Sequence, residues 1–153
     1  MTHPTGLEMG PIDFFTADHR ACDERWAEVE SALAARDPQA ARAAFAAFDG
    51  VVRRHFEMEE QVLFPALEAA TGMTMGPTQV MRIEHQQMRG LLAQMATEAA
   101  TDLDALLESG DTLLMFTQQH NMKEEGIVYP MADAHLGAQW AELAPQLARY
   151  LAP

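Results

Sequence analysis

Apolar residues recur at steps of three and four along most of the chain, a spacing that places them on one face of a helix. The pattern predicts four long amphipathic helices, over about residues 12–36, 38–65, 77–99 and 103–130. A fifth and shorter stretch, over residues 137–151, follows the same rule. The fold class predicted from these patterns is therefore all-α.

Capping residues and prolines mark the ends of the predicted helices. Asp37-Pro38 is a helix start, because the Asp side chain accepts hydrogen bonds from free amides and Pro at the first helical position has no amide to leave unpaired. Asp102 supplies a second cap before the last long helix. Pro65 and Pro130 are expected to kink or restart their helices, since a proline inside a helix loses a hydrogen bond and clashes with the preceding turn.

The chain divides at a loop over residues 71–77, and the two halves repeat one another. The motif His55-x-x-x-Glu59 returns in the second half as His120-x-x-x-Glu124, and no gap is needed to align the copies. In each copy an apolar pair, an aromatic residue and a proline follow. Because four residues slightly exceed one helical turn, the His and the Glu of each copy project from one helix face, about 5–6 Å apart.

Lone histidines on the other two long helices complete the repeat. In the first half, the cap Asp37 lies midway along the sequence between the lone His19 and the motif histidine His55. In the second half, the cap Asp102 lies within one position of the midpoint between His85 and His120. A helix rises about 1.5 Å per residue, so an antiparallel hairpin that turns at the cap brings each lone His level with a motif. Two such hairpins related by a pseudo-twofold axis form an up-down-up-down four-helix bundle.

Composition sets the remaining limits on fold and partners. We expect an irregular N-terminal arm over residues 1–11, the bundle over 12–135 and a short C-terminal helical tail over 136–153. The net charge of −13 argues against a nucleic-acid partner, because phosphate binding needs clustered Lys and Arg. No apolar run is long enough to span a membrane and no signal peptide is visible, so we expect a cytoplasmic monomer or homodimer. The only cysteine, Cys22, excludes an internal disulfide.

The predicted bundle brings six potential metal ligands to one level: His19, His55, Glu59, His85, His120 and Glu124. Imidazoles and carboxylates together suit iron, manganese, cobalt or zinc better than magnesium or calcium, which prefer oxygen ligands alone. Two facing carboxylates can bridge two ions, and each ion would then take two histidines. This leaves an open coordination position, which distinguishes a reactive site from a closed structural one. A lone His on an apolar face is more often a core histidine, but four of them at one level favour a metal site.

These motifs resemble the hemerythrin-like (HHE cation-binding) domain family. The resemblance covers about residues 14–130 and rests on four fragments: Asp18-His19, His55-x-x-x-Glu59-Glu60-x-x-Leu63-Phe64-Pro65, Glu84-His85 and His120-x-x-x-Glu124-Glu125-x-x-x-Tyr129-Pro130. It implies a four-helix bundle around an oxo- or hydroxo-bridged centre of two iron ions. The donor chemistry leaves manganese and zinc open as other metals.

Two features depart from the oxygen-carrying members of that family. Those members have a second His four residues after the third-helix His, where this chain has Arg89, and they space the last His and carboxylate by five. Here Glu124 lies at four and Glu125 at five. We expect solvent or one of Glu57, Glu60 and Glu125 to replace the missing ligand, and Arg89 to pair with a carboxylate or lie at the site entrance. The pattern does not favour reversible oxygen carriage.

Several other residues are expected to lie outside the ligand set. His3 in the arm and His135 beyond the last long helix are predicted to be surface residues. Tyr129 is placed to hydrogen-bond near the site, although packing explains an aromatic residue there equally well. Methionines are expected to fill gaps in the core, in particular Met81, Met88, Met95 and Met115.

The resemblance favours a non-haem di-iron binding protein that handles O2, NO, peroxide or iron, in sensing, stress defence or repair of iron centres. One alternative is a di-iron oxidase, peroxidase or catalase-like enzyme, although no substrate pocket is visible in the sequence. A second alternative is a passive interaction module stabilised by a structural or redox-inert metal.

Overall fold

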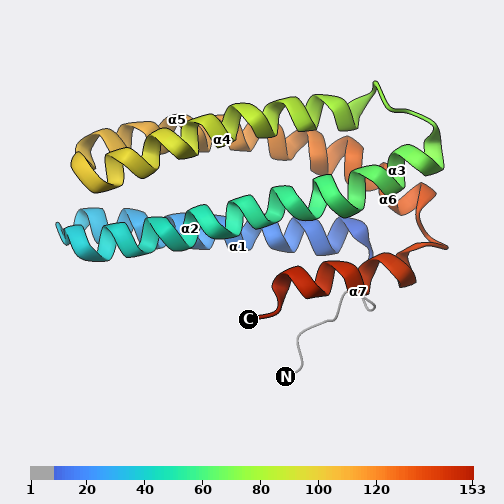
Figure 1. The fold of residues 1–153 in the computed structure, drawn as a ribbon, viewed down its shortest axis with the longest axis horizontal. Helices are drawn as coiled ribbons and strands as arrows, with labels where there is room; N and C mark the ends of the chain where they lie inside the picture. The colour runs from blue at the N-terminus through green and yellow to red at the C-terminus, as the bar shows by residue number, and fades with distance from the viewer. Residues whose placement is uncertain (1–8) are drawn as a thin grey trace.

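The computed structural model describes residues 9–153, and these residues form helices and turns without a β-strand. The bundle consists of α1 (Pro11–Ala34), α2 (Pro38–Met58), α4 (Pro77–Thr101) and α5 (Leu103–Lys123). Two shorter helices prolong α2 and α5, namely α3 (Phe64–Thr71) and α6 (Tyr129–His135), and α7 (Trp140–Leu151) packs against α2 and the turn that follows it. Figure 1 shows the α1–α2 hairpin lying along the α4–α5 hairpin. The predicted all-α bundle with a short C-terminal helix is confirmed.

The helix starts agree with the capping signals in the sequence, with one shift. The side chain of Asp37 accepts a hydrogen bond from the Ala40 amide, as that of Asp102 does from the Ala105 amide, each at 3.1 Å. Helix α1 begins at Pro11, the residue predicted to end the irregular arm. Proline suits the first helical position because its missing amide costs nothing there. Residues 1–8, the greater part of that predicted arm, lie outside the described part of the chain.

A π-turn interrupts each helix that carries a His-x-x-x-Glu motif. These turns span Glu59–Leu63 and Glu124–Val128, so each begins at the glutamate of the motif, six residues before the proline. The helices restart beside Pro65 and Pro130, as expected, but the break lies earlier than the prolines themselves. At the end of each turn a backbone amide donates a hydrogen bond to the carbonyl five residues earlier. An α-helix spaces these two groups by four residues, so each π-turn contains one extra residue.

Two apolar clusters fill the bundle, one on either side of the motif residues. The first lies among α3, α6, α7 and the start of α1, and includes Phe15, Phe64 and Tyr129. The second lies towards the α1–α2 and α4–α5 connections, and includes Trp26 and Met88. The polar residues of the motifs are therefore enclosed along the bundle axis by apolar packing.

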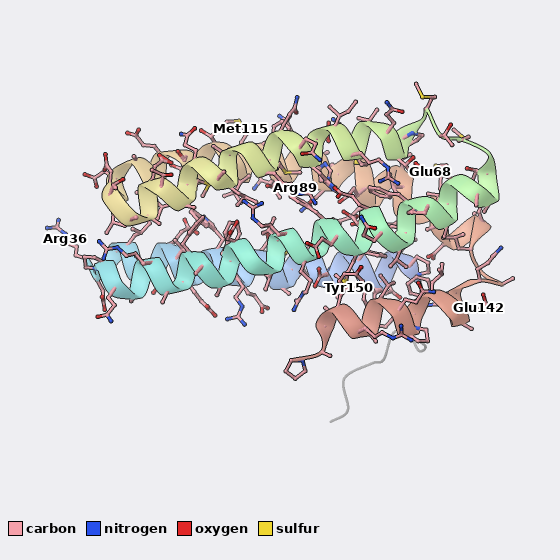
Figure 2. The ribbon with its side chains drawn as sticks, in the orientation of Figure 1. Arg36, Glu68, Arg89, Met115, Glu142 and Tyr150 are labelled. Atoms are coloured by element: carbon pink, nitrogen blue, oxygen red, sulfur yellow. The ribbon has the colours of Figure 1, made fainter. Side chains whose placement is uncertain are left out.

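One expected core methionine lies at the surface. Met81, Met88 and Met95 are at most 2% exposed, as predicted, but Met115 is 61% exposed and points away from α5 in Figure 2. Met115 follows the buried Leu113 by two residues, which turns it about 200° round the helix. Within residues 9–153, no helix combines the length and apolar character that crossing a bilayer requires.

Gly110 gives a stability prediction, because α5 and α1 meet there. A Cβ atom at this position would lie 2.1 Å from Trp26 Cζ2, far inside van der Waals contact. Overpacking costs about 1–3 kcal/mol, which outweighs the helix-propensity gain of about 1 kcal/mol from Gly to Ala. We therefore expect Gly110→Ala to lower the free energy of unfolding, measured by urea denaturation.

The matched control is Gly90→Ala on α4, where an added Cβ meets no heavy atom within 4 Å. This variant should be stabilised by about 0.5–1 kcal/mol, because alanine restricts the unfolded chain and favours the helix. Equal stabilisation of both variants would contradict the close approach of α1 and α5.

Candidate metal centre

The six predicted ligands converge between the two apolar clusters. The four histidines come from the four long helices, and each glutamate is the first residue of a π-turn. All six are at most 5% exposed. Their donor atoms form two groups, and within each group every atom lies within 4.8 Å of the others. The first position consists of His19, His55, Glu59 and Glu124, and the second of His85, His120 and the same two glutamates.

The two glutamates lie between the positions. Glu59 Oε1 is 3.3 Å from Nε2 of His55 and 3.1 Å from Nε2 of His85. Glu124 Oε1 is 3.0 Å from Nε2 of His19 and 3.1 Å from Nε2 of His120. Each carboxylate thus faces one imidazole of each position, which is the arrangement needed to bridge two ions.

Every histidine of the site turns its other ring nitrogen outwards to a carboxylate. The Nδ1 distances are 2.7 Å from His19 to Glu125, 2.7 Å from His55 to Asp18, 2.6 Å from His85 to Glu60 and 2.8 Å from His120 to Glu84. An ionised carboxylate only accepts hydrogen bonds, so each Nδ1–H donates and each Nε2 is directed to the centre, where a neutral ring offers its lone pair. Such outer carboxylates fix the ring and raise its basicity as a metal ligand.

The outer carboxylates follow the repeat of the chain. Asp18 and Glu84 each precede a lone histidine but bind the motif histidine of the same hairpin. Glu60 and Glu125 each follow a motif glutamate but bind the lone histidine of the other hairpin. Sequence reasoning named Glu60 and Glu125 as candidates and gave no role to Asp18 or Glu84. The available signal was an acidic residue directly before the lone histidine in both halves.

Several inward atoms have no hydrogen-bond partner among the described residues. Whether a metal ion could serve as their common partner depends on which atoms they are. These buried atoms are Glu59 Oε1, His85 Nε2, His120 Nε2 and Glu124 Oε2. A buried polar atom without a partner costs about 1–3 kcal/mol. All four are atoms that can donate a lone pair to a metal, and they face one another, so a metal ion that displaces the ring protons would satisfy them together. The donor set therefore fits a metal ion of the imidazole- and carboxylate-binding kind.

The electrostatics of the site also favour positive charge. Burial opposes protonation of His55, but the negative charge of Glu59 and hydrogen bonds to carboxylates raise its pKa well above the usual value. Burial likewise opposes protonation of His85, yet hydrogen bonds to carboxylates raise its pKa to about 10. Burial would raise the pKa of Glu124, but hydrogen bonds from the four histidines hold it well below its usual range. The interior thus attracts cations, whether protons or metal ions.

Arg89 and Glu57 lie apart from the inner ligands. The Arg89 guanidinium reaches from α4 (Figure 2) and makes two hydrogen bonds of 2.8 Å to the carboxylate of Glu60. Burial opposes ionisation of Glu60, but hydrogen bonds from His85 and Arg89 lower its pKa to about 2. Glu57 is exposed, so its side chain is not part of the buried site. The structure therefore places Arg89 as the partner of a carboxylate that orients His85.

Tyr129 lies inside the site, beside the first position. Its ring is fully buried and stacks on Phe15 with 5.3 Å between the ring centres. Its hydroxyl donates a hydrogen bond of 2.7 Å to Glu59 Oε2 and lies 3.0 Å from His19 Nε2. Burial and the charges of Glu124 and Glu59 raise the pKa of this phenol well above its usual value.

A small apolar cavity adjoins the site on the side away from Tyr129. It measures about 40 Å³, room for a few water-sized molecules. Three histidines border it (His19, His55 and His120), and its other walls include Trp26, Phe48, Val52, Phe56, Met88 and Leu113. Asp23, Thr117 and Asn121 line both this cavity and an open surface groove. The cavity and the groove therefore share one wall.

Cys22 and His135 lie outside the inner ligand set. Cys22 borders the cavity, and burial raises the pKa of its thiol to about 11, so the thiol is neutral. His135 is exposed at the end of α6, away from the buried site. His3 falls among residues 1–8, outside the described part of the chain.

Comparison with known proteins assigns the family. The family model for the hemerythrin HHE cation binding domain matches residues 10–132, most of the chain. Searches of curated proteins and of solved structures found no match. The family match and the buried His/Glu groups together indicate a metal-binding protein, with iron as the indicated metal. The matched segment spans all four long helices and all six buried ligands, and the chain belongs to the hemerythrin HHE cation binding domain family.

Proposed function

We propose that this protein binds two iron ions through His19, His55, Glu59, His85, His120 and Glu124, and that it handles O2, NO, peroxide or iron itself. The observation that carries the proposal is the pair of buried donor groups sharing two carboxylates. When bound, ferrous ions would supply an open coordination position and a redox change shared between two metals. The chain's own residues hold, orient and enclose the ions.

The surroundings of the site support a small ligand. The adjoining cavity is apolar and about 40 Å³, which suits a diatomic molecule or peroxide better than an organic substrate of several rings. Its walls are mostly apolar around the three histidines that border it. We place the protein's role in sensing, in defence against oxidative or nitrosative stress, or in repair of iron centres, and expect it to act in the cytoplasm.

Metal content of the purified protein tests the ligand assignment. We expect two irons per chain in protein prepared without added metal. His55→Ala and His120→Ala should each lose metal, because each removes one imidazole from a different position. The control is His135→Ala, whose side chain is exposed, and His3→Ala should also keep its metal. Full iron content in both core variants would overturn the assignment.

The outer carboxylates give a second test. Asp18→Asn removes the charge that orients His55 without changing the side-chain volume much. We expect metal affinity to fall about 10–100-fold, the usual effect of losing such a partner. Competition with a coloured chelator, using zinc or cobalt, measures the change. Asp111→Asn on the exposed face of α5 is the control, and equal affinities for both variants would show that Asp18 does not support the site.

Reaction with peroxide and NO separates the proposal from the enzyme alternative. We expect the iron-loaded protein to bind NO and to consume peroxide stoichiometrically with its iron. His55→Ala should do neither. Repeated turnover of peroxide would instead favour an oxidase, peroxidase or catalase-like enzyme. A redox-inert native metal, with unfolding on chelation, would favour a passive interaction module.

A further inference from the structure

The hydroxyl of Tyr129 touches every donor of the first position. Its oxygen lies 2.7 Å from Glu59 Oε2, 3.0 Å from His19 Nε2, 3.1 Å from Glu124 Oε1 and 3.5 Å from His55 Nε2. Each outer carboxylate contacts one histidine, at the ring nitrogen that points away from the centre. Tyr129 faces all four from inside the site, so its role differs from that of the outer carboxylates.

The spacing of these atoms matches that of ligands around one ion. Two donors that bind an ion at about 2.1 Å and at right angles lie about 3.0 Å apart. The four distances from the Tyr129 oxygen bracket that value. The donors themselves keep similar spacings, since His19 Nε2 and Glu124 Oε1 are 3.0 Å apart. The phenol oxygen therefore stands where a fifth donor to the same ion would stand.

The second position has no such oxygen from the matching residue. The repeat of the chain matches Tyr129 with Phe64, which has no hydroxyl. The Phe64 ring packs against His85, with 5.8 Å between the ring centres. The two positions therefore share the same imidazole and carboxylate pattern but differ by one phenol oxygen.

The π-turn explains how Tyr129 reaches the site. Tyr129 follows Glu124 by five residues, which in a regular α-helix would place it about 140° away round the axis. The turn Glu124–Val128 inserts one extra residue, and the Tyr129 amide bonds to the Glu124 carbonyl. This brings the tyrosine back towards the face of the glutamate. The cavity borders the same position from the other apolar cluster, so Tyr129 does not block it.

We propose that the phenol oxygen of Tyr129 is a fifth protein ligand to the metal ion held by His19, His55, Glu59 and Glu124, and that the second position lacks a counterpart. The proposal rests on the metal centre proposed above. Coordination forms a bond from the oxygen lone pair to the ion, and the phenol proton leaves to solvent without oxidation or reduction. The two metal positions are therefore chemically inequivalent, with three oxygen donors at the first and two at the second.

The test is spectroscopic and uses the full chain loaded with ferric iron. A phenolate bound to ferric iron absorbs visible light by charge transfer, and Raman excitation into that band enhances tyrosine ring vibrations. We expect both signals in the wild type and their loss in Tyr129→Phe, which removes one oxygen atom. The chain has only two tyrosines, so Tyr150→Phe on α7 (Figure 2) is the matched control and should keep both signals.

A titration with cobalt supplies a second measurement. In Tyr129→Phe one of the two ions should bind at least about tenfold more weakly, while the other is unchanged. If Tyr129→Phe does not fold, as judged by circular dichroism, retention of the band in Tyr150→Phe still assigns it to Tyr129. Loss of the band in Tyr150→Phe, or its retention in folded Tyr129→Phe, would overturn the inference.

The outcomes also separate this inference from the proposed function. A wild-type protein that holds two irons but shows no phenolate band would remove Tyr129 from the ligand set and leave the di-iron proposal intact. A wild-type protein that binds no iron would remove both.

Discussion

The structure depends on two glutamates that are fully buried at the centre of the bundle. An isolated buried carboxylate is strongly unfavourable, so Glu59 and Glu124 need compensating groups from every side. Four imidazoles supply part of that compensation at distances near 3 Å, and hydrogen bonds between these groups raise the pKa of His85 and lower that of Glu124. A cation between the donors would complete it. The fold can therefore be understood as a scaffold that brings four helices to one level around two negative charges.

The outer carboxylates turn this local need into a constraint on the whole bundle. A helix could slide or rotate against its neighbour if apolar packing alone held it. Each outer hydrogen bond instead links two helices, as in Asp18 of α1 with His55 of α2 and Glu84 of α4 with His120 of α5. Glu60 and Glu125 link the two hairpins in the same way. The network therefore fixes the register between neighbouring helices and the orientation of each imidazole. A shift of one residue in either hairpin would break the hydrogen bonds on which the register and the orientation depend.

The helices and the six inner residues could be predicted because they follow from helical periodicity. Nearly equal sequence intervals on either side of each cap are enough to set the lone histidines level with the motifs. The place of Tyr129 could not be derived in this way, because a regular helix turns it away from Glu124 and only the π-turn restores it. Asp18 and Glu84 were also not predicted as partners of the imidazoles, since Asp18 binds His55 on the next helix and not its neighbour His19. The exposure of Met115 could not be predicted from the residue type, because a methionine is as compatible with an exposed helix face as with a core.

The repeat of the sequence and the asymmetry of the structure have different origins. Duplicated hairpins generate two positions with the same imidazole and carboxylate donors, and nothing in that pattern distinguishes them. Two features outside the pattern do so: the hydroxyl of Tyr129, where the other half has Phe64, and an apolar cavity that borders both histidines of the first position but only His120 of the second. Both features lie at the first position. The Tyr129 hydroxyl places an oxygen atom beside the donors, and the cavity leaves a space next to them. The cavity shares Asp23, Thr117 and Asn121 with the open groove, so the asymmetry places the space nearest that groove beside the position that the phenol also contacts.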